Sequence, residues 1–232
     1  MSDTYGGNLG PGDAGVSGSG YPGYPATFRF DAPEKVANWR PVVNWLLAIP
    51  HFLILWPLRT LSQVCAVISW VAILFTGRLP AGLANAQGMY LRYTLRTWSF
   101  AGFLREEYPP FSFSPTPGDP GDDPRALVAV DPDLGERNRV TAFFRIILAI
   151  PHLIVVALLE IALLVVAIIG FFAVLFTGRW PVGLRSFALG VARWWLRVQA
   201  YLLLLTDEYP PFAFDDLGGT APQPVAAPPA PA

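Results

Sequence analysis

The two histidines are the side chains of this sequence best suited to chemistry. His51 and His152 are the only histidines, lie 101 residues apart, and each ends the pentapeptide Leu-Ala-Ile-Pro-His. If two related halves packed about a pseudo-twofold axis, the imidazoles could meet and ligate a haem iron or another metal ion. The commoner role is to satisfy the backbone carbonyl that the preceding proline, which lacks an N–H, leaves free one turn back. No cysteine or carboxylate is placed to complete a mononuclear site, so we expect no cofactor and keep metal or haem binding as an alternative.

Arginines spaced four residues apart form the second candidate site. Arg92 and Arg96 recur as Arg193 and Arg197 at the same offset. Residues four apart share one helix face, so each pair could bind a phospholipid headgroup or an anionic substrate. Anchoring at the cytoplasmic boundary of a membrane is the commoner use of such arginines. The arginines predicted to lie at lipid headgroups or the interface are Arg78, Arg92, Arg96, Arg179, Arg193 and Arg197.

Two pairs of adjacent carboxylates resemble general acid–base machinery. They are Glu106-Glu107 and Asp207-Glu208, each directly before a Tyr-Pro-Pro turn at a predicted helix end. That position favours salt bridges to nearby arginines over catalysis. The chain contains no phosphate-binding loop, nucleophile elbow, His-Glu-x-x-His motif or Cys-x-x-Cys motif, which are short signatures with an enzymatic mechanism. The sequence therefore predicts a protein that is not an enzyme.

Most of these residues recur because the chain repeats itself at a fixed offset of 101 residues. The match needs no gap from position 47 to position 113 and includes Leu-Phe-Thr-Gly-Arg-x-Pro and Glu-Tyr-Pro-Pro-Phe. Such a match indicates duplication of one folded unit. Within the unit, glycine caps a helix and proline prevents its continuation. The residues of the repeated turns are Gly77, Pro80, Tyr108, Pro109, Pro110, Gly178, Pro181, Tyr209, Pro210 and Pro211.

The composition indicates that the duplicated unit lies in a membrane. Apolar residues make up 53% of the chain and charged residues 14%, whereas about 25% is usual for soluble domains, so too few charges remain to cover a water-facing surface. The net charge of −1 hides a segregation, since positions 41–105 contain five arginines and no acidic residue. A basic, apolar body suits an anionic membrane leaflet, and we expect no nucleic-acid partner. Cys65 is the only cysteine, which excludes an intramolecular disulfide.

Two long apolar segments are expected to cross the membrane. Residues 41–77 carry Arg59 as their only charge, and their counterpart, residues 142–178, carries Arg145 near its start and Glu160. One helix of this length would span about 56 Å, against a hydrocarbon core of about 30 Å. Arg59 and Glu160 mark the midpoints, where a charge is tolerated at a hairpin tip but is costly at the bilayer centre. We therefore predict two transmembrane helical hairpins, and a continuous bent helix is the alternative in the second repeat. Arg59 and Glu160 could form an ion pair between the hairpin tips, and two unrelated interfacial charges are the alternative.

The residues on either side of each hairpin carry different patterns. Segments 83–104 and 184–205 have helical periodicity but place arginine, tyrosine and tryptophan among leucine and phenylalanine. This composition is typical of an amphipathic helix in the membrane interface, and a third transmembrane pass is the alternative. Short alternating segments predict β-strands that could pair within each repeat and together form a small cytoplasmic sheet. These segments are 27–31, 111–114, 127–131 and 212–215.

The sequence as a whole predicts an all-α membrane protein built from two tandem repeats. Low-complexity composition predicts disorder at both ends, and a Pro/Asp-rich linker separates the repeats. By the positive-inside rule, we expect a multi-pass protein of the inner (plasma) membrane with both termini cytoplasmic. The predicted segments are a Gly-rich tail over 1–24, repeat 1 over 25–114, the linker over 115–125, repeat 2 over 126–216 and a Pro/Ala-rich tail over 217–232.

Three motifs stand together in each repeat: Ile-Pro-His, Leu-Phe-Thr-Gly-Arg-x-Pro and Glu-Tyr-Pro-Pro-Phe, with two arginines between the last two. In these motifs the chain resembles a bacterial, largely actinobacterial, integral membrane family catalogued only as a domain of unknown function (forty-three eighty-nine). The resemblance covers nearly all of the chain outside the tails and linker, once per repeat. It implies a membrane protein, often with tandem copies, and it implies no activity and no catalytic residue.

A body ringed by arginines and without a catalytic constellation favours a non-enzymatic membrane scaffold or accessory protein. Its expected partners are a bilayer with anionic headgroups and either another membrane protein or a second copy of itself. The alternative is a small-molecule or ion transporter with a pathway between the repeats near His51 and His152, although few polar groups lie within the apolar segments. A haem- or metal-binding membrane protein is the third hypothesis.

Overall fold

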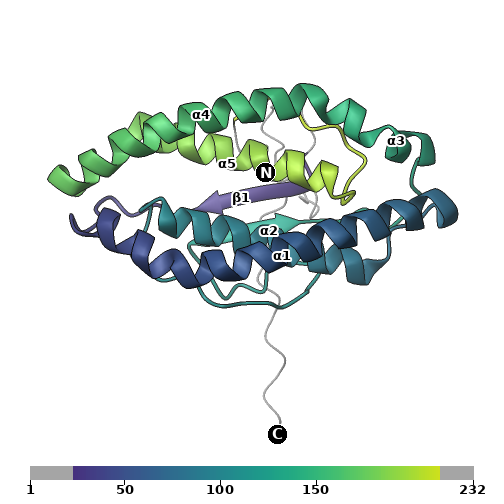
Figure 1. Cartoon of the computed structure of the whole chain (residues 1–232), viewed down its shortest axis with the longest axis horizontal. Helices are drawn as coiled ribbons and strands as arrows, with labels where there is room; N and C mark the ends of the chain where they lie inside the picture. The colour runs from purple at the N-terminus through teal and green to yellow at the C-terminus, as the bar shows by residue number, and fades with distance from the viewer. Residues whose placement is uncertain (1–22, 215–232) are drawn as a thin grey trace, which may run out of the picture.

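The computed structural model describes residues 23–214, and these residues form five helices and two short strands (Figure 1). The predicted tails, 1–24 and 217–232, lie outside the described residues except for positions 23 and 24. Tyr24 is buried, and its hydroxyl donates to the Glu208 carbonyl at 3.1 Å, so the folded part begins before the predicted boundary. The elements are β1 (Ala26–Phe30), α1 (Arg40–Thr76), α2 (Ala81–Ala101), β2 (Ala126–Val130), α3 (Arg139–Phe143), α4 (Arg145–Thr177) and α5 (Val182–Leu202).

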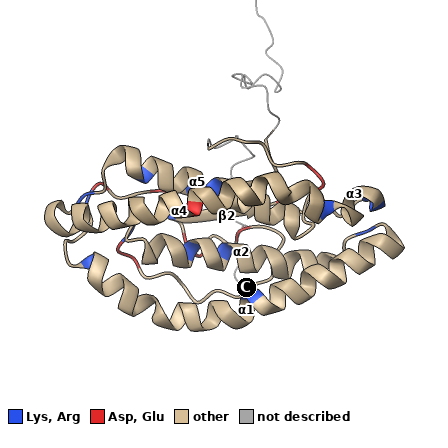
Figure 2. Cartoon of the chain, turned by 45° about the horizontal axis from the view of Figure 1, so that its top comes forward, with Lys and Arg blue, Asp and Glu red and all other residues tan. Residues whose placement is uncertain are grey.

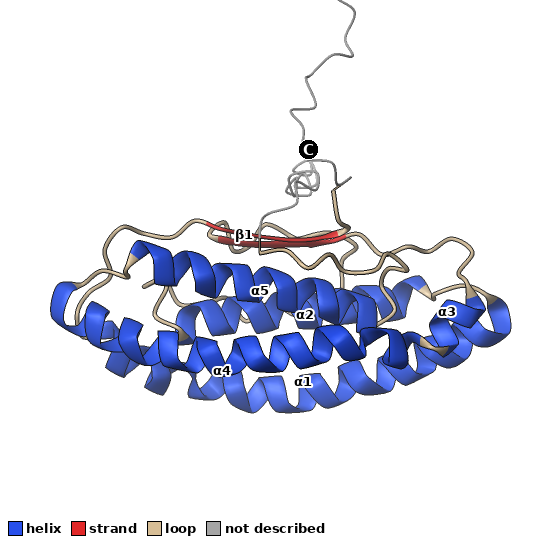
Figure 3. Cartoon of the chain, turned by 90° about the horizontal axis from the view of Figure 1, so that it is seen from above, coloured by secondary structure: helices blue, strands red, loops and turns tan. Residues whose placement is uncertain are grey.

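The elements form three layers, which are seen edge-on in Figure 3. The long helices α1 and α4 make one outer layer, the shorter helices α2 and α5 lie beneath them, and the two strands cover the opposite face. Each long helix packs on the shorter helix of its own repeat, whereas each strand packs on the shorter helix of the other repeat. The main core lies between the shorter helices and the sheet, where Phe28, Leu91 and Leu196 are at most 2% exposed.

The two repeats are interlocked about a pseudo-twofold axis. The Gly77 carbonyl at the end of α1 accepts a hydrogen bond from Arg137 N at 2.8 Å. The equivalent Gly178 carbonyl at the end of α4 accepts one from Val36 N at 2.9 Å. β1 and β2 pair antiparallel across the same axis, and α1 and α4 run in opposite directions (Figure 1). Each repeat therefore supplies the backbone hydrogen bond that ends the other's long helix and the strand that pairs with the other's strand.

The predicted hairpins are wrong. α1 is one helix of 37 residues that passes through Arg59, and α4 is one helix of 33 residues that passes through Glu160. Pro50 and Pro57 lie inside α1 without ending it, because packing on α2 along the helix offsets the hydrogen bonds that prolines remove. The continuous helix considered for the second repeat thus describes both repeats. The hairpin prediction assumed that each segment crosses a bilayer upright. The continuous helices show that the segments do not turn back at their midpoints.

The shorter helices are not exposed amphipathic helices either. From Leu91 to Ala101, every residue of α2 except Trp98 is buried, because α1 covers one side of the helix and β2 the other. α5 lies between α4 and β1 in the same way. The arginine spacing that suggested an amphipathic surface helix belongs to interior contacts instead.

The strand predictions are partly correct. Strands form over residues 26–30 and 126–130, one position earlier than predicted, and they pair with each other across the repeats. The closing segments, 111–114 and 212–214, are not strands, and position 215 lies outside the described residues. Pairing within a repeat was the wrong expectation because the closing segments cover the histidines, as described below.

The packing of the repeats leaves no space for a side chain at Gly170 in α4. A Cβ there would lie 2.2 Å from the Trp180 ring, and Trp180 Nε1 donates to the Phe103 carbonyl of the other repeat at 3.2 Å. We predict that Gly170→Ala lowers the free energy of unfolding by about 1–3 kcal/mol, because overpacking displaces the ring. Gly183→Ala is the control, since nothing lies within 4 Å of its Cβ position. Thermal unfolding in detergent micelles measures both variants, and equal stabilities would contradict this packing.

Candidate functional site

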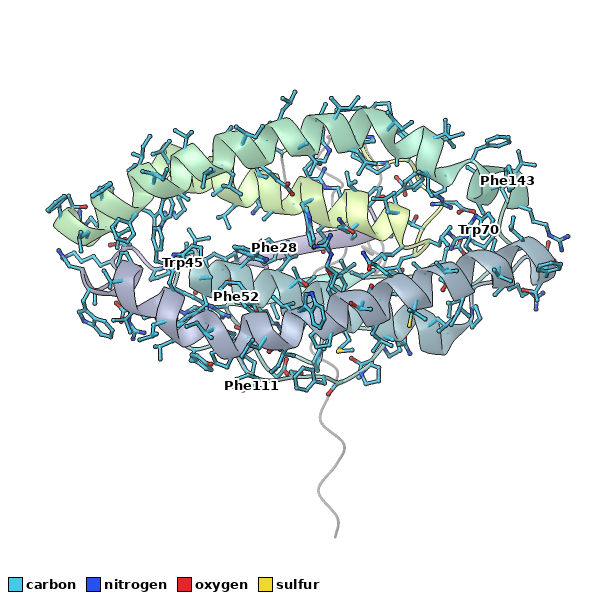
Figure 4. The ribbon with its side chains drawn as sticks, viewed as in Figure 1. Phe28, Trp45, Phe52, Trp70, Phe111 and Phe143 are labelled. Atoms are coloured by element: carbon cyan, nitrogen blue, oxygen red, sulfur yellow. The ribbon has the colours of Figure 1, made fainter. Side chains whose placement is uncertain are left out.

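His51 is completely buried on the inner side of α1, in a cage of aromatic rings. Its Nδ1 is 2.7 Å from the Tyr93 hydroxyl of α2. The imidazole stacks on Phe111 with a ring-centroid distance of 4.3 Å and an interplanar angle of 8°, and the Tyr108 ring lies 4.8 Å away. The Tyr108 hydroxyl donates to the Leu47 carbonyl at 3.1 Å. The closing segment of the repeat thus folds back over α1, where Phe111 is labelled in Figure 4.

His152 occupies the equivalent cage in the second repeat. It stacks on Phe212 with a centroid distance of 4.0 Å and an angle of 19°, and the Tyr209 ring lies 4.7 Å away. On the shorter helix, Trp194 Nε1 donates to His152 Nδ1 at 3.2 Å. An indole N–H can only donate, so Nδ1 accepts and the ring is the neutral tautomer with its hydrogen on Nε2.

The two cages explain why the Pro-His and Tyr-Pro-Pro-Phe motifs recur together. The motifs meet within each repeat, so the structure builds two separate cages and not one site shared by both histidines. Both imidazoles are fully buried and stacked against aromatic rings. Within residues 23–214, no group of three His, Cys, Asp or Glu side chains is arranged to hold a metal ion. The arrangement therefore ties the closing segment to the long helix.

Arg96 and Arg105 hold the predicted linker inside the protein. Arg96 forms ion pairs with Asp119 at 2.8 Å and Asp122 at 2.7 Å, and Arg105 pairs with Asp123 at 2.7 Å. Both arginines, Asp119 and Asp123 are at most 4% exposed. Buried charges of this kind are tolerated only when they are paired and hydrogen-bonded. The predicted linker, residues 115–125, is therefore a strap that is bound across α2.

The surroundings of Asp122 lower the pKa of its carboxyl group. Burial by itself raises the pKa of the Asp122 carboxyl, but a hydrogen bond with Ser112 and the charge and hydrogen bond of Arg96 outweigh burial. The pKa of Asp122 therefore lies below its usual value. The ionised form is the one that the folded strap stabilises.

Asp207 is the centre of the corresponding network in the second repeat. It accepts hydrogen bonds from Arg137 Nη2 at 2.7 Å and from Arg145. Burial raises the pKa of Asp207, but the hydrogen bonds and charges of these two arginines outweigh it, so the pKa lies below its usual value. Arg145 also donates to the Tyr201 carbonyl at the end of α5, at 3.1 Å, where Asn44 makes the equivalent bond in the first repeat.

Three of the four adjacent carboxylates form salt bridges, as the sequence predicts. Glu106 pairs with Arg40 at 3.8 Å, and Glu107 pairs with Arg125 at 2.7 Å. Asp207 is held by two arginines, as described above. These acids therefore join the ends of the shorter helices to other parts of the chain.

Four of the six arginines predicted at lipid headgroups face the interior. Arg92, Arg96 and Arg197 are at most 3% exposed. Arg193 Nε donates to the Phe28 carbonyl of β1 at 3.2 Å. Such arginines position the strap and the sheet, and their side chains are not free to reach a lipid surface.

Arg78 and Arg179 are the two members of that set that are exposed. Each follows the glycine that ends a long helix in the left-handed conformation, Gly77 with φ 73° and Gly178 with φ 66°, which confirms these predicted turns. The Arg78 side chain is 68% exposed and reaches Glu136 only at 3.9 Å. Because α1 and α4 are antiparallel, Arg78 and Arg179 lie at opposite ends of the molecule.

The predicted ion pair between Arg59 and Glu160 does not form. Both residues are exposed, and no ion pair joins them in the part of the chain that the structure describes. The pairing depended on two hairpin tips, and the continuous helices have none. Figure 2 shows how few charged residues lie along α1 and α4.

The outer side of α1 and α4 is an apolar surface that the sequence analysis did not define. Both helices are long and apolar enough to cross a membrane. Their covered sides face the shorter helices, so large apolar side chains on the other sides remain exposed (Figure 4). The most exposed include Leu53 (70%), Trp56 (78%) and Phe75 (78%) of α1, and Ile146 (71%) and Phe176 (76%) of α4.

Comparison with known proteins identifies the same two units. The family model described as "Domain of unknown function (DUF4389)" matches residues 39–112 and, a second time, residues 139–213. Both ranges fall within the repeats predicted from the sequence. No curated protein and no solved structure matches the chain.

A pH titration tests the two arginine–carboxylate networks. Asp122 and Asp207 have pKa values below their ordinary value of 3.8 in the folded protein, so the unfolded chain binds more protons in acid. Their contribution to stability is complete above the ordinary pKa and is lost as the pH falls through the folded pKa. We predict that the free energy of unfolding falls below about pH 4. The double variant Asp122→Asn/Asp207→Asn should be less stable at pH 7 and less sensitive to acid, and a wild-type acid response in that variant would contradict this origin.

Proposed function

The chain belongs, in two tandem copies, to the family described as a domain of unknown function (DUF4389), and we propose that it is a non-enzymatic membrane scaffold that binds anionic lipid. Its apolar outer layer contacts acyl chains, and its exposed arginines contact headgroups. The proposed location is the plasma membrane, whose inner leaflet is anionic, with both termini in the cytoplasm.

The observation that carries this proposal is the size of the apolar surface on α1 and α4. Exposed apolar side chains continue from Trp39 to Phe75 on α1 and from Ile146 to Phe176 on α4. Soluble monomers rarely expose a contiguous apolar patch of more than a few hundred Å². A bilayer covers such a surface without needing a specific partner for each side chain.

The positions of the exposed arginines support anionic headgroups as the polar part of this contact. Arg78 and Arg179 directly follow the two helices that carry the apolar surface. Arg139 is also exposed, and its guanidinium lies over Gly77 beside Arg78. A basic residue near an anionic membrane surface contributes about 1 kcal/mol to binding.

Vesicle flotation with the purified full-length protein tests lipid selectivity. During detergent removal the protein is offered vesicles of phosphatidylcholine alone and denser vesicles that also contain phosphatidylglycerol. We predict preferential recovery with the anionic vesicles, and Arg78→Gln/Arg179→Gln should reduce this preference by about tenfold or more. Arg29→Gln/Arg125→Gln removes the same charge on the sheet side and should change the preference little.

The outcomes of flotation separate the two parts of the proposal. Absence of the protein from both kinds of vesicle would overturn a membrane function. Equal recovery with neutral and anionic vesicles would remove the headgroup contact and leave only the apolar one.

Exposed aromatic side chains of the closing segments support a contact with a second membrane protein. Tyr108 and Phe111 are 42% and 49% exposed, and their counterparts Tyr209 and Phe212 are 43% and 55% exposed. Aromatic residues are enriched at protein interfaces. A photocrosslinker in place of Phe111 should capture one reproducible protein in native membranes, and capture of lipid alone would remove this contact from the proposal.

A further inference from the structure

We infer that the α1–α4 layer lies flat within a single leaflet of the bilayer and does not cross it. This inference rests on the proposed membrane function and specifies how the protein meets lipid. The occupant of the apolar surface is then the acyl-chain region of one leaflet, and the sheet side faces water.

The lengths of the two helices are the first argument. The 37 residues of α1 and the 33 residues of α4 correspond to about 56 Å and about 50 Å. To fit a hydrocarbon core of about 30 Å, they would have to tilt by more than about 50°. Transmembrane helices usually tilt by about 0–40°. A helix lying in the plane of the membrane has no such limit.

The position of the sheet is the second argument. β1 and β2 run alongside the helices, on the opposite face of the same layers, and do not lie beyond the helix ends (Figure 3). Within residues 23–214 the sheet has only these two strands, so each has one edge without a neighbouring strand. Upright helices would place these open edges and the strap at membrane depth, where open sheet edges exposed to lipid do not occur. A flat layer leaves them in water.

The distribution of charge is the third argument. α1 and α4 run in opposite directions, so upright helices would place Arg78 on one side of the bilayer and Arg179 on the other. The positive-inside rule would then favour neither orientation. Arg59 and Glu160, exposed at the midpoints of the helices, would lie near the bilayer centre, where charge is costly. In a flat layer, all four charges can reach the headgroups of one leaflet, Arg59 and Glu160 by extending from the helix flanks.

Labelling of twin positions tests the inference. Lys35 and Glu136 are exposed and occupy equivalent positions in the two repeats. Lys35 precedes Val36, which binds Gly178 at the end of α4, and Glu136 precedes Arg137, which binds Gly77 at the end of α1. Because α1 and α4 run in opposite directions, these two helix ends lie at opposite ends of the long axis. In full-length protein with Cys65→Ser, we introduce Lys35→Cys or Glu136→Cys and treat right-side-out and inverted membrane vesicles with a membrane-impermeant maleimide. A flat layer predicts that both variants label from the same side with a ratio near one. Gly118→Cys on the strap, where a side chain meets open space, should label from that side as well.

The alternative outcomes are distinct. Labelling of the two variants from opposite sides would overturn the flat arrangement and show that the helices cross. Failure of both variants to label before detergent is added would also overturn it, because the ends would then be buried. Flotation of each variant is measured in parallel, so loss of membrane association, which would overturn the proposed function itself, is recognised separately.

Discussion

The reciprocal closure of the two long helices is the constraint on which the rest of the structure depends. Each helix ends at a left-handed glycine, and the carbonyl of that glycine accepts a backbone hydrogen bond from the other repeat. These bonds fix the antiparallel direction of α1 and α4 and bring the two strands together. The sheet can therefore form only when both repeats are present, because its strands come from different repeats and each packs on the other repeat's helix.

The interior of this assembly is unusually polar for a protein with so apolar a surface. Four arginines are buried in it: Arg96 and Arg105 bind the strap, and Arg137 and Arg145 bind Asp207. Many large apolar side chains of the long helices remain exposed instead. Because these arginines are shielded from water, each needs a carboxylate and hydrogen-bond partners within the protein. Each histidine cage adds an aromatic contact to this interior, because Phe111 stacks on His51 and Phe212 stacks on His152.

The predictions from sequence succeeded where the physical signal was local. The end of each long helix was predicted correctly because glycine at the C-cap acts within one turn, and Gly77 and Gly178 have that conformation. The salt bridges of Glu106 and Glu107 were also expected, since acids at a helix end lie near arginines. The hairpin was wrong because Arg59 was interpreted with respect to a bilayer crossed upright, which is an assumption about the environment and not a local signal. Arg92 and Arg96 were placed at the surface because helical spacing identifies a shared face but does not say what covers it.

The sequence by itself determined the duplication, the apolar character of the long segments and the turns that end them. These properties depend on composition and on residues a few positions apart. Only the tertiary structure decided that the strands pair across the repeats, that each histidine is enclosed by the closing segment of its own repeat, and that one side of each long helix is left exposed. Those features depend on contacts between residues separated by many tens of positions, such as His51 with Tyr93 and Val36 with Gly178. The contact between Val36 and Gly178 also joins the two repeats, so neither repeat alone determines it.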